Sequence, residues 1–328
     1  MEKKLNILIL MKKIWKFPKH KPKTDLFKAL EEQANIYYWH EDGHIKQIIK
    51  QIRIKPDFIF HYDIAWENRL APKIMGLDKT DVPTGCFVID LHWKPKERIR
   101  YFKENKIDII FSVTKNPFLK MFPKFKDKHR WLPWSIDPQI MKDYKQKKDI
   151  NLLLMGLFYI DSEERGKHPL PKKMPPKGRY AFRDAVFKNF KDREDFVFHP
   201  HPGHLVKKAN NIFVNEKYAK ELNRSKIFFT CGSRISTGSV AVLKYFEALA
   251  CNSLLLAESN KEVEELGFID GQHFVSCTVD NVVNKVEYYL NHDKERQQIT
   301  ENGYHFVHQF HTNNVRAKQM IQFIKASI

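Results

Sequence analysis

Residues 226–258 read KIFFTCGSRISTGSVAVLKYFEALACNSLLLAE, and this stretch decides the fold class. It holds an apolar run at 226–231, a polar loop at 232–239, an apolar helical stretch at 240–251 and a second apolar run at 253–258. Apolar runs without alternation are typical of strands that are buried on both faces. A helix between two such strands is typical of a parallel βαβ unit.

The same alternation extends in both directions from this stretch. Further apolar runs lie at 5–11, 57–63, 86–91, 108–113, 151–156, 196–199 and 273–277. Helical stretches lie between them at 25–35, 94–104, 179–190, 216–223 and 281–291, and two longer ones follow at 293–310 and 313–326. Strands that alternate with helices predict an α/β protein with parallel sheets.

The alternation breaks once, where WLPWSIDP is followed by the hydrophilic run 142–149. A chain of 328 residues fits two domains of roughly 150 residues each. We therefore predict two Rossmann-like domains that face each other across a cleft, at 1–148 and 149–310. We also consider that the helix at 311–328 packs back on the first domain.

The charge is unevenly distributed along the chain. There are 57 Lys and Arg residues against 39 Asp and Glu, a net charge of +18, and residues 1–150 hold 32 basic and 19 acidic residues. The first half is therefore expected to approach an anionic partner. The four cysteines lie far apart, as is typical of reduced thiols, and no apolar run has the roughly 18 to 20 residues of a membrane span. We predict a cytoplasmic protein, with peripheral membrane contact left open.

Lys244 and Glu247 are the only charged residues of the helical stretch 240–251. A spacing of three places both on one face of a helix that is apolar elsewhere, so both need partners. Two interpretations stay open. The residues form an ion pair with each other, or Glu247 accepts hydrogen bonds from ligand hydroxyls such as those of a ribose while Lys244 faces a phosphate.

The loop 232–239 has the composition of a phosphate-binding turn. It supplies Arg234, Ser236, Thr237 and Gly238 immediately before a helix, where backbone N–H groups and the helix dipole favour an anion. The alternative is a loop in which a hydroxyl caps the helix. We take these four residues as candidates for binding a diphosphate.

Several segments of the second half resemble one family in order along the chain. They read LLLMGLFY, YAKELNRSKIFF, KYFEALACNSLLLAES, ELGFIDGQHFV, YYLNHDKERQQITENGYHFV and HTNNVRA, and the resemblance is strongest over residues 216–317. This part of the chain resembles the C-terminal domain of GT-B glycosyltransferases, and within them the CgeB-like, spore-maturation branch. The N-terminal half resembles the family in architecture, with an echo in VIDLHW and WLPWSIDP.

The resemblance implies a nucleotide-sugar donor, UDP-linked by the habit of the family, in the second domain and an acceptor in the first. In related retaining enzymes two glutamates flank seven residues. The second glutamate, which binds the donor ribose, matches Glu247, whereas the first falls on Ser239. The stereochemical outcome of the transfer therefore stays open.

The sequence contains no D-x-D triplet, so we expect metal-independent chemistry with no cofactor besides the donor. Arginine, lysine and helix dipoles then meet the charge of the leaving group. Besides Arg234 and Lys244, we assign Arg179 and Arg183 to this role, since four residues apart they share a helix face. Solvated surface arginines are the alternative.

Gly156 and His199 end two further strands of the second domain and complete the candidate donor site. His199 begins the segment HPHPGH. A metal site, a donor or cleft-lining role and a structural loop are all considered for this segment. We assign His199 to the donor and no residue to a metal, because no cysteine or nearby acidic residue completes a ligand set.

Asp90 and His92 follow the strand at 86–89 at the expected ligand edge of the first domain. Either side chain could deprotonate an acceptor hydroxyl or stabilise positive charge on the sugar carbon. We take them as the catalytic candidates, with Asp63 and His61 as alternates at the end of the preceding strand. The competing interpretation is an aspartate that caps a turn.

Lys12, Lys13, Trp15 and Lys16 follow the first strand and interleave cations with an aromatic ring. We assign them to the acceptor, although such a run is also typical of a solvated face. The acceptor is then anionic, such as a cell-wall polymer, a lipid-linked glycan or hydroxymethylated DNA.

The sequence thus predicts a GT-B glycosyltransferase that moves a sugar from a nucleotide diphosphate donor. Two alternatives are kept. One is a nucleic-acid-binding protein on a glycosyltransferase scaffold, and the other is a transferase of polyol phosphate.

Overall fold

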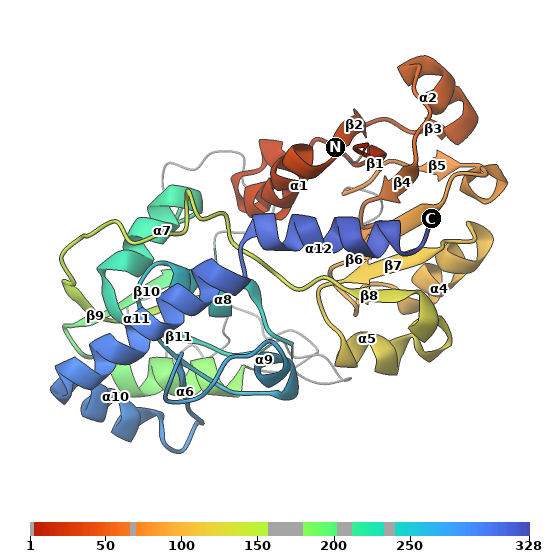
Figure 1. The fold of residues 1–328 in the computed structure, drawn as a ribbon. Helices are drawn as coiled ribbons and strands as arrows, with labels where there is room; N and C mark the ends of the chain where they lie inside the picture. Colours follow the sequence, from red (N-terminus) through yellow and green to blue (C-terminus); the bar gives the residue numbers. More distant parts are fainter. Residues whose placement is uncertain (1–2, 66–69, 157–179, 202–211, 233–239) are drawn as a thin grey trace. The chain divides into compact units, whose positions relative to one another are not determined.

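The computed structural model describes residues 3–65, 70–156, 180–201, 212–232 and 240–328. The chain divides into two compact units, labelled by element in Figure 1. Unit 1 comprises Met1–Pro133 and Asn313–Ile328, and unit 2 comprises Trp134–Thr312. In the described residues, no helix is both long and apolar enough to cross a membrane.

Unit 1 is built on a parallel sheet of six strands in the order β2-β1-β4-β6-β7-β8. The strands are β1 (Asn6–Leu10), β2 (Asn35–Trp39), β4 (Phe58–His61), β6 (Thr84–Val88), β7 (Ile109–Ser112) and β8 (His129–Trp131). A two-stranded sheet pairs β3 (Gly43–His44) with β5 (Ile74–Met75). Within the six-stranded sheet the strand order is 2-1-3-4-5-6, a doubly wound arrangement.

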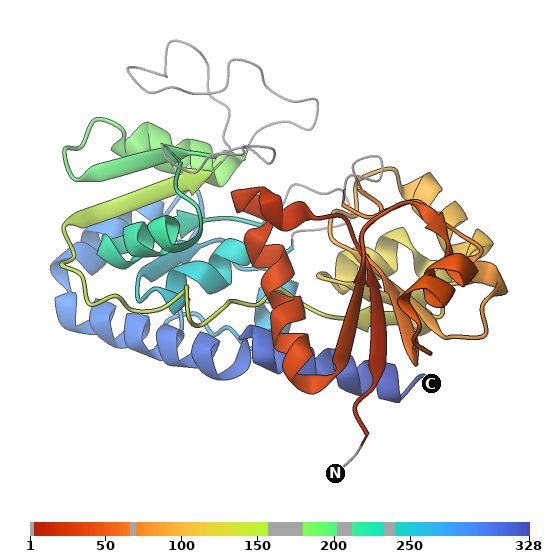
Figure 2. The same ribbon diagram turned by 90° about the horizontal axis from the view of Figure 1, so that it is seen from above.

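Helices connect these strands. They are α1 (Lys21–Gln33), α2 (Ile45–Ile52), α4 (Pro95–Glu104) and α5 (Asn116–Met121), with 3-10 turns at Ile14–Lys16, Pro18–His20, Leu77–Lys79 and Pro123–Lys128. The helix α12 (Asn313–Lys325) also belongs to unit 1 and packs on α1, as Figures 1 and 2 show. It buries Met320 and Ile324 and brings Phe323 within 6.4 Å of the Phe111 ring centroid on β7.

Unit 2 has a parallel sheet of five strands in the order β10-β9-β11-β12-β13. The strands are β9 (Ile150–Gly156), β10 (Phe196–Pro200), β11 (Ser225–Thr230), β12 (Leu254–Ala257) and β13 (Val275–Ser276). Its helices are α6 (Ala181–Phe190), α7 (Asn215–Arg224), α8 (Leu243–Ala250), α9 (Lys261–Glu265), α10 (Val282–Asn291) and α11 (Asp293–Phe310).

Both faces of the unit 2 sheet are covered, which explains why its strands read as continuous apolar runs. Leu153 and Phe228 belong to one core with residues of α7, α8 and α11. Their neighbours along the strands, Leu152 and Phe229, belong to a second core with residues of α6 and α10. Successive side chains of a strand point to opposite faces, so each strand contributes to both cores. The predicted α/β class is therefore confirmed.

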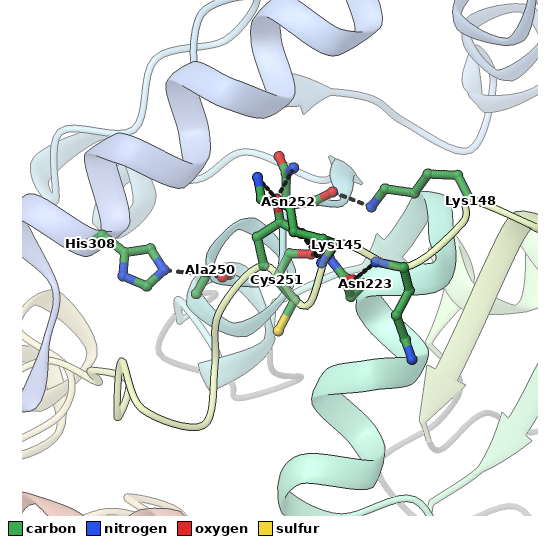
Figure 3. Close-up of polar contacts among 9 residues, drawn as sticks. Lys145, Lys148, Asn223, Ala250, Cys251, Asn252 and His308 are labelled. Atoms are coloured by element: carbon green, nitrogen blue, oxygen red, sulfur yellow. Dashed lines mark hydrogen bonds and ion pairs between the residues drawn. The ribbon is translucent and has the colours of Figure 1, made fainter.

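Unit 2 begins at Trp134, earlier than the limit of 148 expected from the hydrophilic run. A polar network, drawn in Figure 3, holds the segment before β9 against this unit. Asn223 donates hydrogen bonds to Asp143 (2.9 Å) and to the carbonyl of Cys251 (3.0 Å). Lys148 donates to the carbonyls of Ser225 and Asn252. The hydrophilic run is thus tied to the amino ends of the strands.

Candidate functional site

The unit 2 sheet contains a topological switch point between β9 and β11. Its strand order is 2-1-3-4-5, so the connections after β9 and β11 lead away in opposite directions along the sheet. In doubly wound sheets, ligands bind beyond the carboxyl ends of the strands at this point. A ligand is therefore expected at the residues that end these two strands and at the helices that follow them.

Arg183 of α6 lies across the switch point. Its guanidinium is so close to the end of β9 that a Cβ at Gly156 would lie 3.2 Å from Nη1. On the other side, Nη2 lies 3.5 Å from the carbonyl oxygen of Cys231, which follows β11. The guanidinium carbon also lies 4.3 Å from the ring centroid of Tyr180, a cation–π contact. The structure thus brings together Gly156 and Arg183, two of the predicted donor-binding residues.

A carboxylate that follows β12 lies within electrostatic reach of this cation. Glu258 is half-buried, and burial raises the pKa of its carboxyl group, an effect that the positive charge of Arg183 partly opposes. Arg183 itself is 6% exposed. A buried guanidinium is costly unless it has anionic or dipolar partners. The carboxyl edge of unit 2 is therefore built to hold positive charge.

Lys244 and Glu247 lie on α8 and meet at one tyrosine of α7. Lys244 Nζ donates to the hydroxyl of Tyr218 at 3.3 Å and lies 4.9 Å from its ring centroid. The carboxylate of Glu247 lies near the Tyr218 hydroxyl, and burial together with this carboxylate raises the pKa of the hydroxyl well above its usual value. Tyr218 therefore lies between the two charged side chains, and Glu247 is 4% exposed.

His199, at the end of β10, has partners within the protein. Its Nε2 lies 2.7 Å from Glu221 Oε1, and its ring stacks on Phe213 with centroids 3.8 Å apart. Glu221 also accepts from Arg224 at 3.0 Å. Burial of Glu221 acts to raise its pKa, but the hydrogen bonds from His199 and Arg224 outweigh it, so the pKa is lowered. The histidine is thus held in a fixed orientation beside the sheet.

The other predicted donor-binding residues lie outside the described residues. These are Arg179, Arg234, Ser236, Thr237 and Gly238. Their assignment stays a prediction. Among the residues that the structure does describe, no three His, Cys, Asp or Glu side chains form a group that could hold a metal ion.

At the carboxyl edge of the unit 1 sheet, the alternates Asp63 and His61 are both buried and bonded. Asp63 accepts from Arg98 Nη1 at 2.7 Å and from the N–H groups of Ala65 (2.9 Å) and Ile89 (2.8 Å). Asp63 is 0% exposed and Arg98 1% exposed. This aspartate fixes the end of β4 to the end of β6 and to α4.

His61 bonds on both sides of its ring. Nδ1 lies 2.6 Å from the Tyr101 hydroxyl, and Nε2 lies 2.8 Å from the carbonyl oxygen of Pro72, to which it must donate. Burial lowers the pKa of His61 to about 4, although the bond to Pro72 and the charge of Asp63 oppose the shift. The imidazole is therefore neutral near pH 7 and packs as part of the core.

Asp90 and His92, the catalytic candidates, lie in the turn between β6 and α4. The backbone carbonyl of Asp90 accepts from Arg98 Nη2 (3.1 Å) and from the N–H of Trp93 (3.1 Å), which fixes the turn. Asp90 is half-buried and His92 is exposed. Lys23 of α1 lies within electrostatic reach of Asp90: burial lowers the pKa of Lys23, and the charge of Asp90 opposes that shift.

The candidate acceptor residues follow β1. Lys12 pairs with Asp42 at 2.8 Å, whereas Lys13, Trp15 and Lys16 are exposed. The indole of Trp15, 41% exposed, contacts the ring of His40 edge-on with centroids 5.2 Å apart. Part of the expected positive surface is therefore neutralised within the protein.

Tyr180, Tyr218 and His40 were not singled out in the sequence. Tyr218 lies in α7, and Lys244 and Glu247 come from a helix that follows it by more than twenty positions. No local pattern links these residues. Only the packing of α7 and α8 on one face of the sheet brings them together.

Comparison with known proteins supports the general class of GT-B glycosyltransferases. A sequence model of a family described as "Glycosyl transferase-like" matches residues 182–322, less than half of the chain. The comparison with curated protein sequences gave no match.

Solved structures match over nearly the whole chain at low identity. HepE from Anabaena, in complex with UDP and glucose, has 11% identity and a TM-score of 0.58, with 98% of this chain and 100% of that chain covered. A glycosyltransferase from Rickettsia africae has 10% identity and a TM-score of 0.61, with 99% of each chain covered.

Sucrose-phosphate synthase from Thermosynechococcus elongatus has 12% identity and a TM-score of 0.59, with 98% of this chain and 99% of that chain covered. At such identities the likeness concerns the fold. Together with the two parallel sheets, it shows that this chain has the GT-B fold of two Rossmann-like domains.

Proposed function

We propose that this chain is a glycosyltransferase that moves a sugar from a UDP-linked donor held by unit 2. The observation that carries the proposal is Arg183, a buried guanidinium at the switch point of the unit 2 sheet, where doubly wound folds bind nucleotides. The matched family region includes Arg183, and HepE, a protein of the same fold, was solved with UDP and glucose. Within this proposal we assign the chain to the CgeB-like branch, which the segments of residues 216–317 resemble.

In the transfer, the bond between the sugar and the β-phosphate breaks and negative charge develops on UDP. Arg183 and Lys244 would stabilise that charge as fixed cations in a partly dehydrated site. Such stabilisation requires no metal ion, and we include metal-independent chemistry in the proposal. Glu247 would accept hydrogen bonds from the ribose hydroxyls, with Tyr218 holding its carboxylate in place.

The acceptor would be bound by unit 1 and would be anionic. Lys13, Lys16 and Trp15 are exposed after β1 and are the candidates for binding it. Asp90 and His92 are the candidates for removing the proton of the attacking hydroxyl. Asp90 has the better support, because its backbone is fixed by Arg98 while its side chain stays half-buried at the end of β6.

Calorimetric titration with UDP tests the donor site. The wild-type protein is expected to bind UDP, and Arg183→Leu is expected to weaken binding about ten- to a hundredfold, the effect of about 1.5–3 kcal/mol for a charge-assisted hydrogen bond. Arg183→Lys keeps the charge and should recover part of the loss. Glu247→Ala should weaken binding by a similar factor.

Arg193 supplies the matched control. It pairs with Asp195 and Glu287 before the amino end of β10, so Arg193→Leu should leave UDP affinity unchanged. Thermal unfolding of each variant separates loss of binding from loss of folding. A wild-type protein that does not bind UDP, or an Arg183→Leu variant that is folded and binds UDP normally, would contradict the proposal.

Two further ligands separate the alternatives kept from the sequence. Tighter binding of CDP than of UDP would favour a transferase of polyol phosphate. Salt-sensitive binding of duplex DNA without any binding of UDP would favour a nucleic-acid-binding protein.

A further inference from the structure

Unit 1 contains a pocket with a volume of about 390 Å³ between α1, the segment after β1 and the end of β2. This volume lies near the lower end of the range of about 300–1,000 Å³ for small-molecule sites. The elements that form it all belong to unit 1, and Figures 1 and 2 show α1 beside β1 and β2.

Aromatic rings form one wall of the pocket. Tyr38 and His40 are two residues apart at the end of β2, so they point to the same side. Their rings are parallel within 17° with centroids 6.2 Å apart, and Trp15 meets His40 edge-on. Trp15 is 41% exposed, so its indole is accessible to a ligand. Flat apolar rings of this kind suit the C–H face of a sugar.

Charged and hydroxyl groups line the part of the pocket that α1 forms. Lys21, Asp25, Lys28 and Glu31 follow each other at intervals of three or four residues and therefore lie along one face of the helix. Asp25 pairs with Lys21 at 3.1 Å and lies 3.8 Å from Lys28, while Glu31 accepts from the Tyr38 hydroxyl at 2.7 Å. Two cations and two anions make this wall electrically balanced.

The charge balance decides between a neutral and an anionic ligand. A phosphate or carboxylate in the pocket would face Asp25 and Glu31 as well as the two lysines. A neutral polyol uses both signs, because its hydroxyls donate to carboxylates and accept from ammonium groups. His40 adds an acceptor, since its Nδ1 lies 2.8 Å from the carbonyl oxygen of Met11 and must carry a proton there. In the neutral ring, Nε2 is then an acceptor.

We propose that this pocket binds one neutral sugar ring of the acceptor, stacked on Trp15 and hydrogen bonded to α1. The inference rests on the proposed function, since it names the part of the acceptor that unit 1 recognises. It also divides the acceptor into two parts. The sugar ring occupies the pocket, while any anionic group lies outside it, beside the exposed Lys13 and Lys16.

Saturation-transfer NMR with the full chain tests the proposal. The probes are the methyl glycosides of glucose, galactose, mannose, N-acetylglucosamine and rhamnose. Each is used at about 10 mM, on the order of the dissociation constants of weakly bound sugars. The wild-type protein is expected to bind at least one of them. Trp15→Ala should weaken that binding about tenfold, whereas Trp15→Phe keeps an aromatic face and should retain most of it.

Tyr288→Ala is the matched control, because Tyr288 is an exposed aromatic residue of unit 2. It should leave glycoside binding unchanged. Inorganic phosphate at the same concentration should not displace the glycoside. Displacement by phosphate would overturn the assignment to a neutral ligand, and displacement by UDP would place the glycoside in the donor site and overturn the inference as well.

The two proposals fail in different ways. A wild-type protein that binds UDP but none of the glycosides, or whose glycoside binding is the same in a folded Trp15→Ala variant, overturns this inference alone. A protein that binds a glycoside in a Trp15-dependent manner but does not bind UDP overturns the proposed donor site and leaves the sugar pocket supported.

Discussion

The carboxyl edges of the two sheets differ in how their charged side chains are joined. In unit 1, Arg98 bonds directly to Asp63 at 2.7 Å, and the aspartate takes two further hydrogen bonds from the backbone. In unit 2, the hydroxyl of Tyr218 accepts from Lys244 and lies near the carboxylate of Glu247. A charge that is directly neutralised and fully bonded supports the fold. Charges connected through a neutral phenol can exchange that partner for a ligand at lower cost.

This difference explains why the position of a residue after a strand does not by itself identify a catalytic group. Asp63 and Asp90 both follow strands of unit 1 and are equivalent in the sequence pattern. In the structure the two residues differ. The carboxylate of Asp63 is hydrogen bonded to Arg98 and to two backbone N–H groups, whereas Asp90 fixes the turn through its backbone carbonyl.

The largest expected effect concerns the direct ion pair of unit 1. Arg98→Met removes one partner and leaves Asp63 as an uncompensated buried charge, which should lower the free energy of unfolding by about 3–5 kcal/mol. Urea denaturation measures this change. Arg100→Met on the same helix is the control, because Arg100 is exposed and lies 4.0 Å from Glu104, which is also exposed. Equal effects of the two variants would show that the buried pair contributes no more to the free energy of unfolding than an exposed arginine does.

The second effect is the response of unit 1 to acid. The folded chain holds His61 with a pKa of about 4, against 6.5 for an unperturbed histidine, so between these values the unfolded chain binds a proton that the folded chain does not. Stability should therefore fall as the pH falls from 6.5 to 4, by about 3 kcal/mol in total. His61→Gln should remove this part of the pH dependence.

Denaturation at several pH values gives the comparison for His61. The exposed His305 serves as control, and His305→Gln should retain the slope of the wild type. A His61→Gln variant with an unchanged slope would mean that other groups carry the acid sensitivity.

The smallest effect concerns the tyrosine of unit 2. Tyr218→Phe removes the hydroxyl that accepts from Lys244 near Glu247 and should cost about 1–2 kcal/mol of stability, less than the loss of the direct pair in unit 1. Tyr288 also bonds to a glutamate, Glu295 at 2.8 Å, but is exposed, so Tyr288→Phe should cost less than about 0.5 kcal/mol. If Tyr218→Phe lowered the free energy of unfolding as much as Arg98→Met does, the charged groups at the two sheet edges would not differ in their contribution to stability.

The sequence was sufficient for most of the fold because the buried strands are apolar on both faces. The edge strand β2 was not predicted, and the expected helix at 25–35 extends into its first residue. The segment NIYYW follows α1 almost directly, without a glycine or proline to mark the end of the helix. It pairs on one side only and is only partly buried, so its pattern differs from that of the central strands.

The site was predictable to the extent that strand ends define it. Gly156 and Arg183 were both selected from the sequence, and the structure brings them into contact. The partners of Asp63 and of Glu247 were not predictable, since Arg98 and Tyr218 lie 35 and 29 positions away along the chain. Such pairs depend on how helices pack over the sheet, which no short stretch of sequence specifies.

The assignment of α12 to unit 1 has a consequence for biosynthesis. Residues 313–328 are translated after all of unit 2, so α1 emerges from the ribosome well before the helix that covers it exists. During that interval the apolar surface on which Met320 and Ile324 later pack is open to chaperones or to misassociation. Unit 2 is contiguous in sequence, so its core can form before α12 is synthesised. Unit 1, although its first residues are synthesised first, is then completed last.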